Sequence, residues 1–206
     1  MGRRSDHSRE ELKALILDAG GTLMAEAGFA GFSAREVAKR IGYTIGTIHN
    51  VFGNVDGLLR AINTQTFALW ADALEERLDR AGADRIAALV AAYFAFARDN
   101  PLRWSAIYEH RLPANTSPPD QAAVRGRLTG IVVREVAAAL GRGVDSDIET
   151  LARSLVATVH GHCTFEASGS WAAMGQSDVE GVALARVRES LAAARDGAAD
   201  DRNARG

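Results

Sequence analysis

The stretch FSAREVAKRIGYTIGTIHNVFGNVDGLL, from Phe32 to Leu59, predicts two short helices joined by a tight turn, followed by the start of a third helix. Ser33 and Glu36 have the spacing of a capping box, so the first helix should begin there. Gly42 follows that helix and can adopt the left-handed conformation that ends it. Two helices joined by about three residues are typical of a helix-turn-helix, which places its second helix in the major groove of DNA.

The neighbouring sequence extends this motif into a three-helix unit. Thr44 should cap the second helix and Asn54 the next one, because their side chains can accept hydrogen bonds from free backbone N–H groups. Ahead of the motif, Ser8 and Glu11 form another capping box, which should start an amphipathic helix. We therefore interpret residues 8–54 as a helix-turn-helix DNA-binding domain.

The motif resembles the DNA-binding domain of the tetracycline-repressor-like (TetR) family of bacterial one-component regulators. The matching pattern is S-x-x-x-V-A-x-x-I-G-Y-T-x-G-T-I-x-x-x-F-G-N-x-D-G-L-L, from Ser33 to Leu59. The remaining three-quarters of the chain matches only in being helical and of the right length. The resemblance implies a homodimer that binds a palindromic operator in double-stranded DNA. It also implies a second domain that dimerises and holds a small effector.

Eight residues of the motif are candidates for contacting DNA. Thr47 can bond a base edge or a phosphate, Ile45 can touch a thymine methyl group, and Asn50 can pair with adenine. The helix N-termini offer free N–H groups to phosphate. Each candidate also has an ordinary structural interpretation, and Ile48 between them should be a core residue. The full set is Ser33, Arg35, Lys39, Thr44, Ile45, Thr47, His49 and Asn50.

Two positions depart from the pattern of the family that the motif resembles. His49 stands where a tyrosine that reaches a phosphate is common, and a histidine ring N–H can replace that bond, more strongly when protonated. Val55 stands where a lysine is common, and valine cannot contact phosphate. We therefore expect DNA binding that is weaker and pH-sensitive near neutrality.

The charge distribution gives only a weak signal for nucleic acid. The chain has 206 residues and a net charge of -2. Residues 1–60 carry eight Lys/Arg against seven Asp/Glu, and residues 61–206 carry sixteen against nineteen. A strongly basic face, which would favour phosphate, is therefore absent from the sequence pattern.

The composition also indicates the cellular compartment in which the protein is expected. The single cysteine, Cys163, excludes an internal disulfide framework and suits a reducing environment. No N-terminal apolar run resembles a signal peptide, and no run of 18 apolar residues could span a membrane. We expect a soluble, cytoplasmic protein without a membrane partner.

The rest of the chain predicts helices alone, which makes the expected fold all-α with about nine helices. A long fourth helix should start near residue 55, and a loop rich in Pro, Ser, Thr and Asn should cover residues 113–119. We interpret residues 55–195 as a ligand-binding and dimerisation domain, and residues 196–206 as a disordered polar tail.

Aromatic residues along this second domain can line an apolar effector cavity, although such residues more often pack in a core. The run His160-Gly161-His162-Cys163 resembles the histidine-glycine element of one group of C-terminal domains in this family, and His160 is either a polar handle for the ligand or a core histidine. A metal needs three or four ligands, so we expect no metal site and no cofactor. The ligand-binding candidates are Trp70, Phe94, Trp104, Tyr108, His160 and Phe165.

Capping boxes formed by Ser146 with Glu149 and by Ser177 with Glu180 should start the eighth and ninth helices. The apolar positions of these two helices can pair across a two-fold axis as a four-helix bundle, or pack within one subunit. These positions are Ile148, Leu151, Leu155, Val159, Val179, Leu184, Val187 and Leu191. The sequence thus predicts a ligand-responsive, sequence-specific transcriptional repressor. The alternative is a regulator-like helical protein that binds a ligand or partner but has lost specific DNA binding. An enzyme is disfavoured, because no paired carboxylates, phosphate loop, nucleophile elbow or metal set is present.

Overall fold

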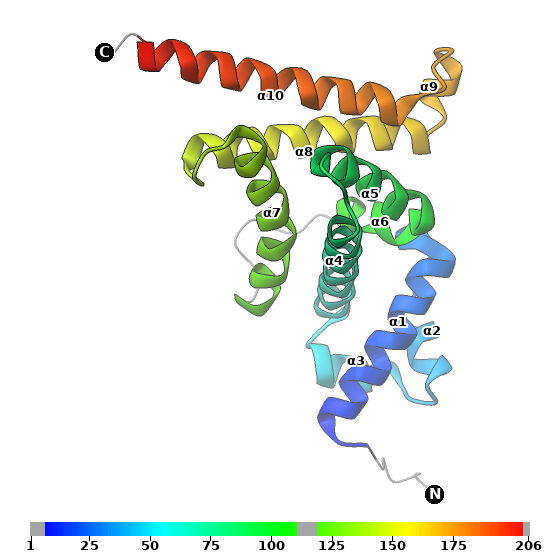
Figure 1. Cartoon of the computed structure of the whole chain (residues 1–206). Helices are drawn as coiled ribbons and strands as arrows, with labels where there is room; N and C mark the ends of the chain where they lie inside the picture. The colour runs from blue at the N-terminus through cyan, green and yellow to red at the C-terminus, as the bar shows by residue number, and fades with distance from the viewer. Residues whose placement is uncertain (1–6, 111–118, 204–206) are drawn as a thin grey trace, which may run out of the picture. The chain divides into compact units, whose positions relative to one another are not determined.

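The computed structural model describes residues 7–110 and 119–203, and this part of the chain is all-α, as predicted (Figure 1). It adds one short helix, α9, to the nine that the sequence indicated. The helices are α1 (Arg9–Gly31), α2 (Ala34–Arg40), α3 (Ile45–Phe52), α4 (Val55–Asp79), α5 (Arg85–Asp99), α6 (Pro101–Glu109), α7 (Pro119–Leu140), α8 (Ser146–Ala167), α9 (Ser170–Ala173) and α10 (Val179–Asn203).

The helices pack as two compact units. The first comprises residues 1–69 and 100–124, and the second comprises residues 70–99 and 125–206, so that α4 contributes to both. The loop predicted before α7 lies outside the described residues except for Pro119, where α7 begins. The functional domain boundaries and the disordered tail stay predictions, and the described part of α10 continues to Asn203.

Local signals start and stop the helices of the first unit. At the start of α1 the capping box is complete: Ser8 Oγ accepts from the Glu11 N–H at 3.2 Å, and the Ser8 N–H donates to Glu11 Oε2 at 2.7 Å. At the end of α2, Gly42 has a φ of 76°. Its N–H and that of Tyr43 bond the last carbonyls of the helix, as in a Schellman motif. The sharp turn that follows sets the direction of α3.

Apolar side chains from five helices, α1, α2, α3, α4 and α6, form the core of the first unit. Ile48, the central residue of α3, has none of its surface exposed. It was predicted to be a core residue rather than a DNA contact, and the structure confirms this. The other fully buried members of this cluster are Ile16, Met24, Val37, Leu58, Ile62 and Ala106.

Helix α6 packs directly on α1 within the same unit. Arg103 donates from Nε to the Gly21 carbonyl at 3.0 Å, and burial lowers the pKa of its guanidinium. Gly21 has no side chain, and a Cβ there would lie 2.6 Å from Arg103 Nη2. Asn63 of α4 adds a hydrogen bond of 3.5 Å to the Ala106 carbonyl. The sequence places this segment in the predicted ligand-binding domain, and in the structure α6 contacts α1 and α4 of the first unit.

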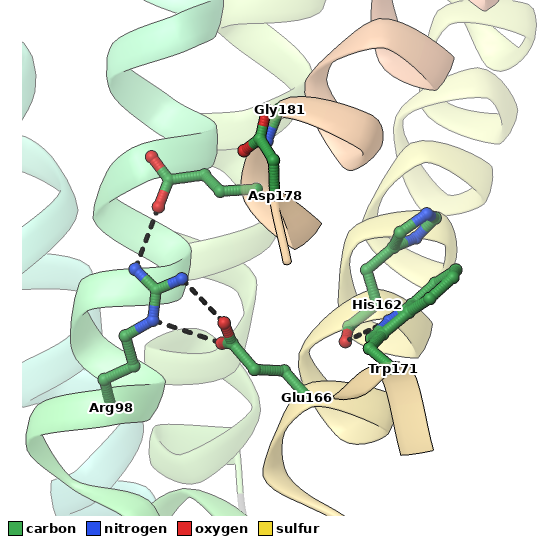
Figure 2. A network of polar contacts seen from close by, with 7 residues as sticks. Arg98, His162, Glu166, Trp171, Asp178 and Gly181 are labelled. Carbon is green, nitrogen blue, oxygen red and sulfur yellow. Dashed lines mark hydrogen bonds and ion pairs between the residues drawn. The ribbon is translucent and has the colours of Figure 1, made fainter. Parts of the chain in front are cut away.

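Two predicted caps in the second unit are wrong by one residue. The side chain of Asp145, rather than Ser146, caps α8, accepting from the Ile148 N–H at 2.9 Å. At α10 the cap is Asp178, rather than Ser177, and it accepts from the Gly181 N–H at 2.9 Å (Figure 2). Aspartate caps a helix as well as serine does, and its charge suits the positive end of the helix dipole.

One arginine ties three helices of the second unit together. Arg98 of α5 donates two hydrogen bonds to the carboxylate of Glu166 of α8, at 2.8 and 3.1 Å (Figure 2). Its third nitrogen donates to Glu180 of α10 at 3.0 Å. The guanidinium also lies 5.1 Å from the centre of the Phe94 ring. A planar fork that meets two carboxylates is stronger than an isolated surface pair.

We predict that Arg98→Met lowers the free energy of unfolding by about 1 kcal/mol, because methionine keeps the apolar stem but loses the three charge-assisted bonds. Urea denaturation followed by circular dichroism measures this. The matched control is Arg153→Met, which removes a single exposed pair within α8 and should cost about 0.3 kcal/mol. Equal losses for the two variants would contradict the proposed role of the fork.

Candidate functional site

Helix α3 exposes one face of the helix-turn-helix. With Ile48 buried, His49 and Asn50 are exposed, and Thr47 is half-buried beside them. Ile45 is also half-buried and packs against the core of the first unit. The predicted base-reading residues thus lie on one short helix. Part of the Ile45 side chain packs against the core, and the rest is exposed to solvent.

Helix α2 and the helix starts supply the predicted phosphate contacts. Ser33, Arg35, Lys39 and Thr44 are all exposed. Ser33 Oγ accepts from the Glu36 N–H at 3.4 Å, so half of the predicted capping box forms. Among the described residues Arg35 forms no ion pair, which leaves its charge available to an anion.

The missing half of that box has a physical reason. The Glu36 carboxylate pairs with Arg40 at 3.5 Å and lies 4.0 Å from Lys39. Arg40 also pairs with Glu26 of α1 at 2.7 Å. Arg40 is therefore neutralised within the protein, whereas Lys39 keeps an 81% exposed side chain.

A contact that the sequence analysis missed holds the end of α3. Arg9 of α1 donates from Nη2 to the Asn50 carbonyl at 3.4 Å. A cation at the C-terminal end of a helix interacts favourably with the helix dipole. The two residues lie 41 positions apart, so no local pattern signals their pairing.

Val55, the second departure from the family pattern, is accounted for by packing. It begins α4, is half-buried and lies against the core of the first unit. Its methyl groups therefore stabilise the fold at a position where the sequence analysis considered only a lost phosphate contact.

A small, partly open cavity lies between helices of the second unit. Its lining comes from five helices and is almost wholly apolar, and its volume is about 40 Å³. Ligand pockets for drug-sized molecules are several times larger, at roughly 300 Å³ or more. The lining residues are Leu74, Ile86, Leu89, Val90, Tyr93, Val132, Val136, Leu155, Val156, Val159 and Val187.

None of the six predicted ligand-binding residues is among this lining. Trp70 packs edge-on against Tyr93 with ring centres 4.7 Å apart, and Phe94 is fully buried beneath Arg98. Trp104 and Tyr108 belong to the first unit. Phe165 is 48% exposed on α8. Their roles in ligand binding stay predictions.

His160, the sixth candidate, lies behind the cavity wall. Its Nδ1 is 3.1 Å from the hydroxyl of Tyr93, whose ring does line the cavity. Its Nε2 is 3.4 Å from the hydroxyl of Thr164. Burial lowers the pKa of His160, so the imidazole is neutral at physiological pH. The predicted polar handle is thus held in a hydrogen-bonded pair with Tyr93.

The remaining reactive groups in the described part of the chain form no metal site. Cys163 is buried, and burial together with the nearby Glu166 carboxylate raises the pKa of its thiol to about 12. Among the described residues no group of three His, Cys, Asp or Glu side chains could hold a metal ion. None of the described helices is long and apolar enough to cross a membrane.

A helix-turn-helix unit followed by a helical unit with an apolar cavity defines a class of two-part DNA-binding regulators. Residues 16–62 match the model for bacterial regulatory proteins of the tetR family, and residues 86–195 match the tetracyclin repressor-like C-terminal domain. The chain belongs to the tetracycline-repressor-like (TetR) family.

Individual relatives agree with this assignment. A helix-turn-helix-type transcriptional regulator of Mycobacterium tuberculosis is 28% identical over 148 residues, which is 69% of this chain and 63% of the relative. The match thus spans less than two-thirds of that protein. A TetR-family transcriptional regulator from Streptomyces coelicolor is 25% identical, with a TM-score of 0.63 over 88% of this chain and 98% of that one.

A solved structure from Rhodococcus sp. RHA1, of a protein of unknown function, shares the fold. Its TM-score is 0.70 at 23% identity, over 94% of this chain and 98% of that chain.

The lowered pKa of His160 predicts a pH dependence of stability. As pH falls through about 6.5, the unfolded chain binds a proton at this histidine more readily than the folded chain, whose His160 pKa is lower, so the unfolding free energy falls. Urea denaturation between about pH 7.5 and 5.5 should show this fall, and His160→Gln should reduce its slope. The same substitution at the exposed His7 is the control. An unchanged slope in His160→Gln would refute the assignment.

Proposed function

We propose that this protein is a ligand-responsive, sequence-specific transcription regulator, which acts as a homodimeric repressor in the cytoplasm. The observation that carries the proposal is the arrangement of α3, whose buried Ile48 leaves His49 and Asn50 exposed beside Thr47. Matches to both the tetR family model and the tetracyclin repressor-like C-terminal domain support it.

In this proposal α3 enters the major groove. Thr47 and Asn50 read base edges, and His49 donates a hydrogen bond to a phosphate. Ser33 and Thr44 present helix N-termini to the backbone, while the exposed cations Arg35 and Lys39 add charge. Because few cations take part, binding should depend on salt with a modest slope.

An electrophoretic shift with the chain's own upstream DNA, across a salt series, tests the proposal. A specific, salt-sensitive shift is expected. No shift at about 50 mM salt, where non-specific binding is strong, beside a control regulator that does shift, would favour the alternative function without specific DNA binding. Selection from random DNA would then separate a distant operator from a lost DNA function.

Substitutions on the exposed face should weaken that shift in different ways. His49→Ala should reduce affinity about tenfold, the effect of losing a hydrogen bond to a charged group. Lys39→Ala should reduce the salt slope by about one unit, because one phosphate contact is lost. Thr150→Ala, exposed on α8, is the control and should change neither. Affinities equal to that of the unaltered chain at every salt concentration would contradict these contacts.

The proposed dimer joins α8 and α10, but not through the positions first considered. Six of those eight apolar residues are buried within a single chain, and only Leu151 and Leu184 are half-buried. The outward face of α8 instead carries Ala157, Gly161 and the exposed Phe165. Small residues beside one aromatic group allow two helices to approach closely across a two-fold axis.

We predict that Gly161→Arg converts the dimer to monomers, measured by size-exclusion chromatography with light scattering. A Cβ at Gly161 would meet no atom within 4 Å in the single chain, so the fold itself tolerates a side chain there. Gly143→Arg, at another open position, is the matched control. A dimer that persists in Gly161→Arg would exclude this face.

Release from DNA requires a ligand that distinguishes two states of the dimer. The ligand must bind the state that cannot match two successive major grooves more tightly than the state that can. A difference of about 2 kcal/mol shifts the equilibrium roughly 30-fold, which is enough for a useful switch. The cavity in the second unit is the proposed site of this ligand.

A further inference from the structure

The cavity in the second unit is lined almost entirely by aliphatic side chains. Ten of its eleven residues are aliphatic, and the eleventh, Tyr93, contributes almost no polar surface. Seven of the eleven are valine or isoleucine, whose branched side chains have few rotamers. The walls of this space of about 40 Å³ are therefore apolar and built largely from conformationally stiff side chains.

Charged residues next to the lining are already paired. Arg85 precedes Ile86 of the lining and makes two hydrogen bonds, of 2.7 and 2.8 Å, with Glu135, which precedes Val136. Likewise Arg188, which follows Val187, pairs with Asp84. A charged ligand would have to break one of these pairs to obtain a counter-ion.

The hydrogen-bonded pair of Tyr93 and His160 next to the cavity is also uncharged. The Tyr93 hydroxyl contacts His160 Nδ1 at 3.1 Å, and burial keeps this imidazole neutral. An isolated ion transferred into such surroundings would lose its hydration without compensation. The cavity thus presents apolar surface on its walls and neutral groups behind them.

We propose that this cavity binds a small, uncharged aliphatic group, and that the regulator's effector carries such a group. Naming the ligand an effector rests on the function proposed above, whereas the binding itself does not. On this proposal the cavity does not bind anions or cations. The proposal also separates this cavity from the aromatic-lined pocket that the sequence had indicated.

Probes with five carbons and different head groups test the proposal on the full-length chain. Pentan-1-ol, pentanoate and pentylammonium are titrated, and binding is followed by methyl NMR of labelled Val, Leu and Ile. Pentan-1-ol should bind saturably and shift the lining methyl groups, with the two ions at least about tenfold weaker. An ion that binds as tightly as pentan-1-ol would overturn the proposal, as would shifts spread equally outside the cavity.

A variant in which the cavity is filled provides a second test of the proposal. Val156→Phe places a bulkier side chain in the lining, where it would occupy the free space, and should abolish pentan-1-ol binding. Val144→Phe is the matched control at a 55% exposed position outside the lining, and should bind normally. Undiminished binding in Val156→Phe would overturn the proposal.

If Val156→Phe does not fold, the head-group comparison on the unaltered chain decides. Because no DNA is present in these titrations, their failure is distinguishable from failure of the DNA shift.

Discussion

Burial of Ile48 is the interaction on which the proposed reading surface depends. Helix α3 runs only from Ile45 to Phe52, and isolated helices shorter than about 12 residues are marginal in water. Tertiary packing must therefore hold it, and Ile48 is its one fully buried side chain. Once that residue is inside, the helical period turns His49 and Asn50 to the solvent. The orientation of the exposed residues thus follows from a residue that need not touch DNA.

The second unit keeps charge and apolar space apart. At its surface, Arg98 pairs with carboxylates of α8 and α10, and Arg85 pairs with a carboxylate of α7. The same unit contains the aliphatic cavity, next to which lie the uncharged side chains of Tyr93 and His160. Ion pairs thus link the helices at the surface, and branched aliphatic side chains line the space inside.

Much of the first unit could be predicted because its signals are local. The capping box at Ser8 and the turn at Gly42 each depend on residues within five positions of one another. Long-range contacts gave no such signal, as the bond from Arg9 to the Asn50 carbonyl illustrates. In the second unit, helical spacing identified apolar residues such as Val187 correctly. Helical spacing does not show whether an apolar residue packs against its own chain or against a second copy of the chain. Nor does it show which apolar residues surround a cavity.

The burial of Cys163 has a practical consequence for studying conformational change. With a thiol pKa of about 12, only about one molecule in 10⁵ carries the reactive thiolate at pH 7. The single native cysteine is therefore nearly silent toward maleimides and methanethiosulfonates. A spin label or fluorophore attached at an introduced surface cysteine would report from that position alone. Distances between two such labels in a dimer could then be followed without first removing a native side chain.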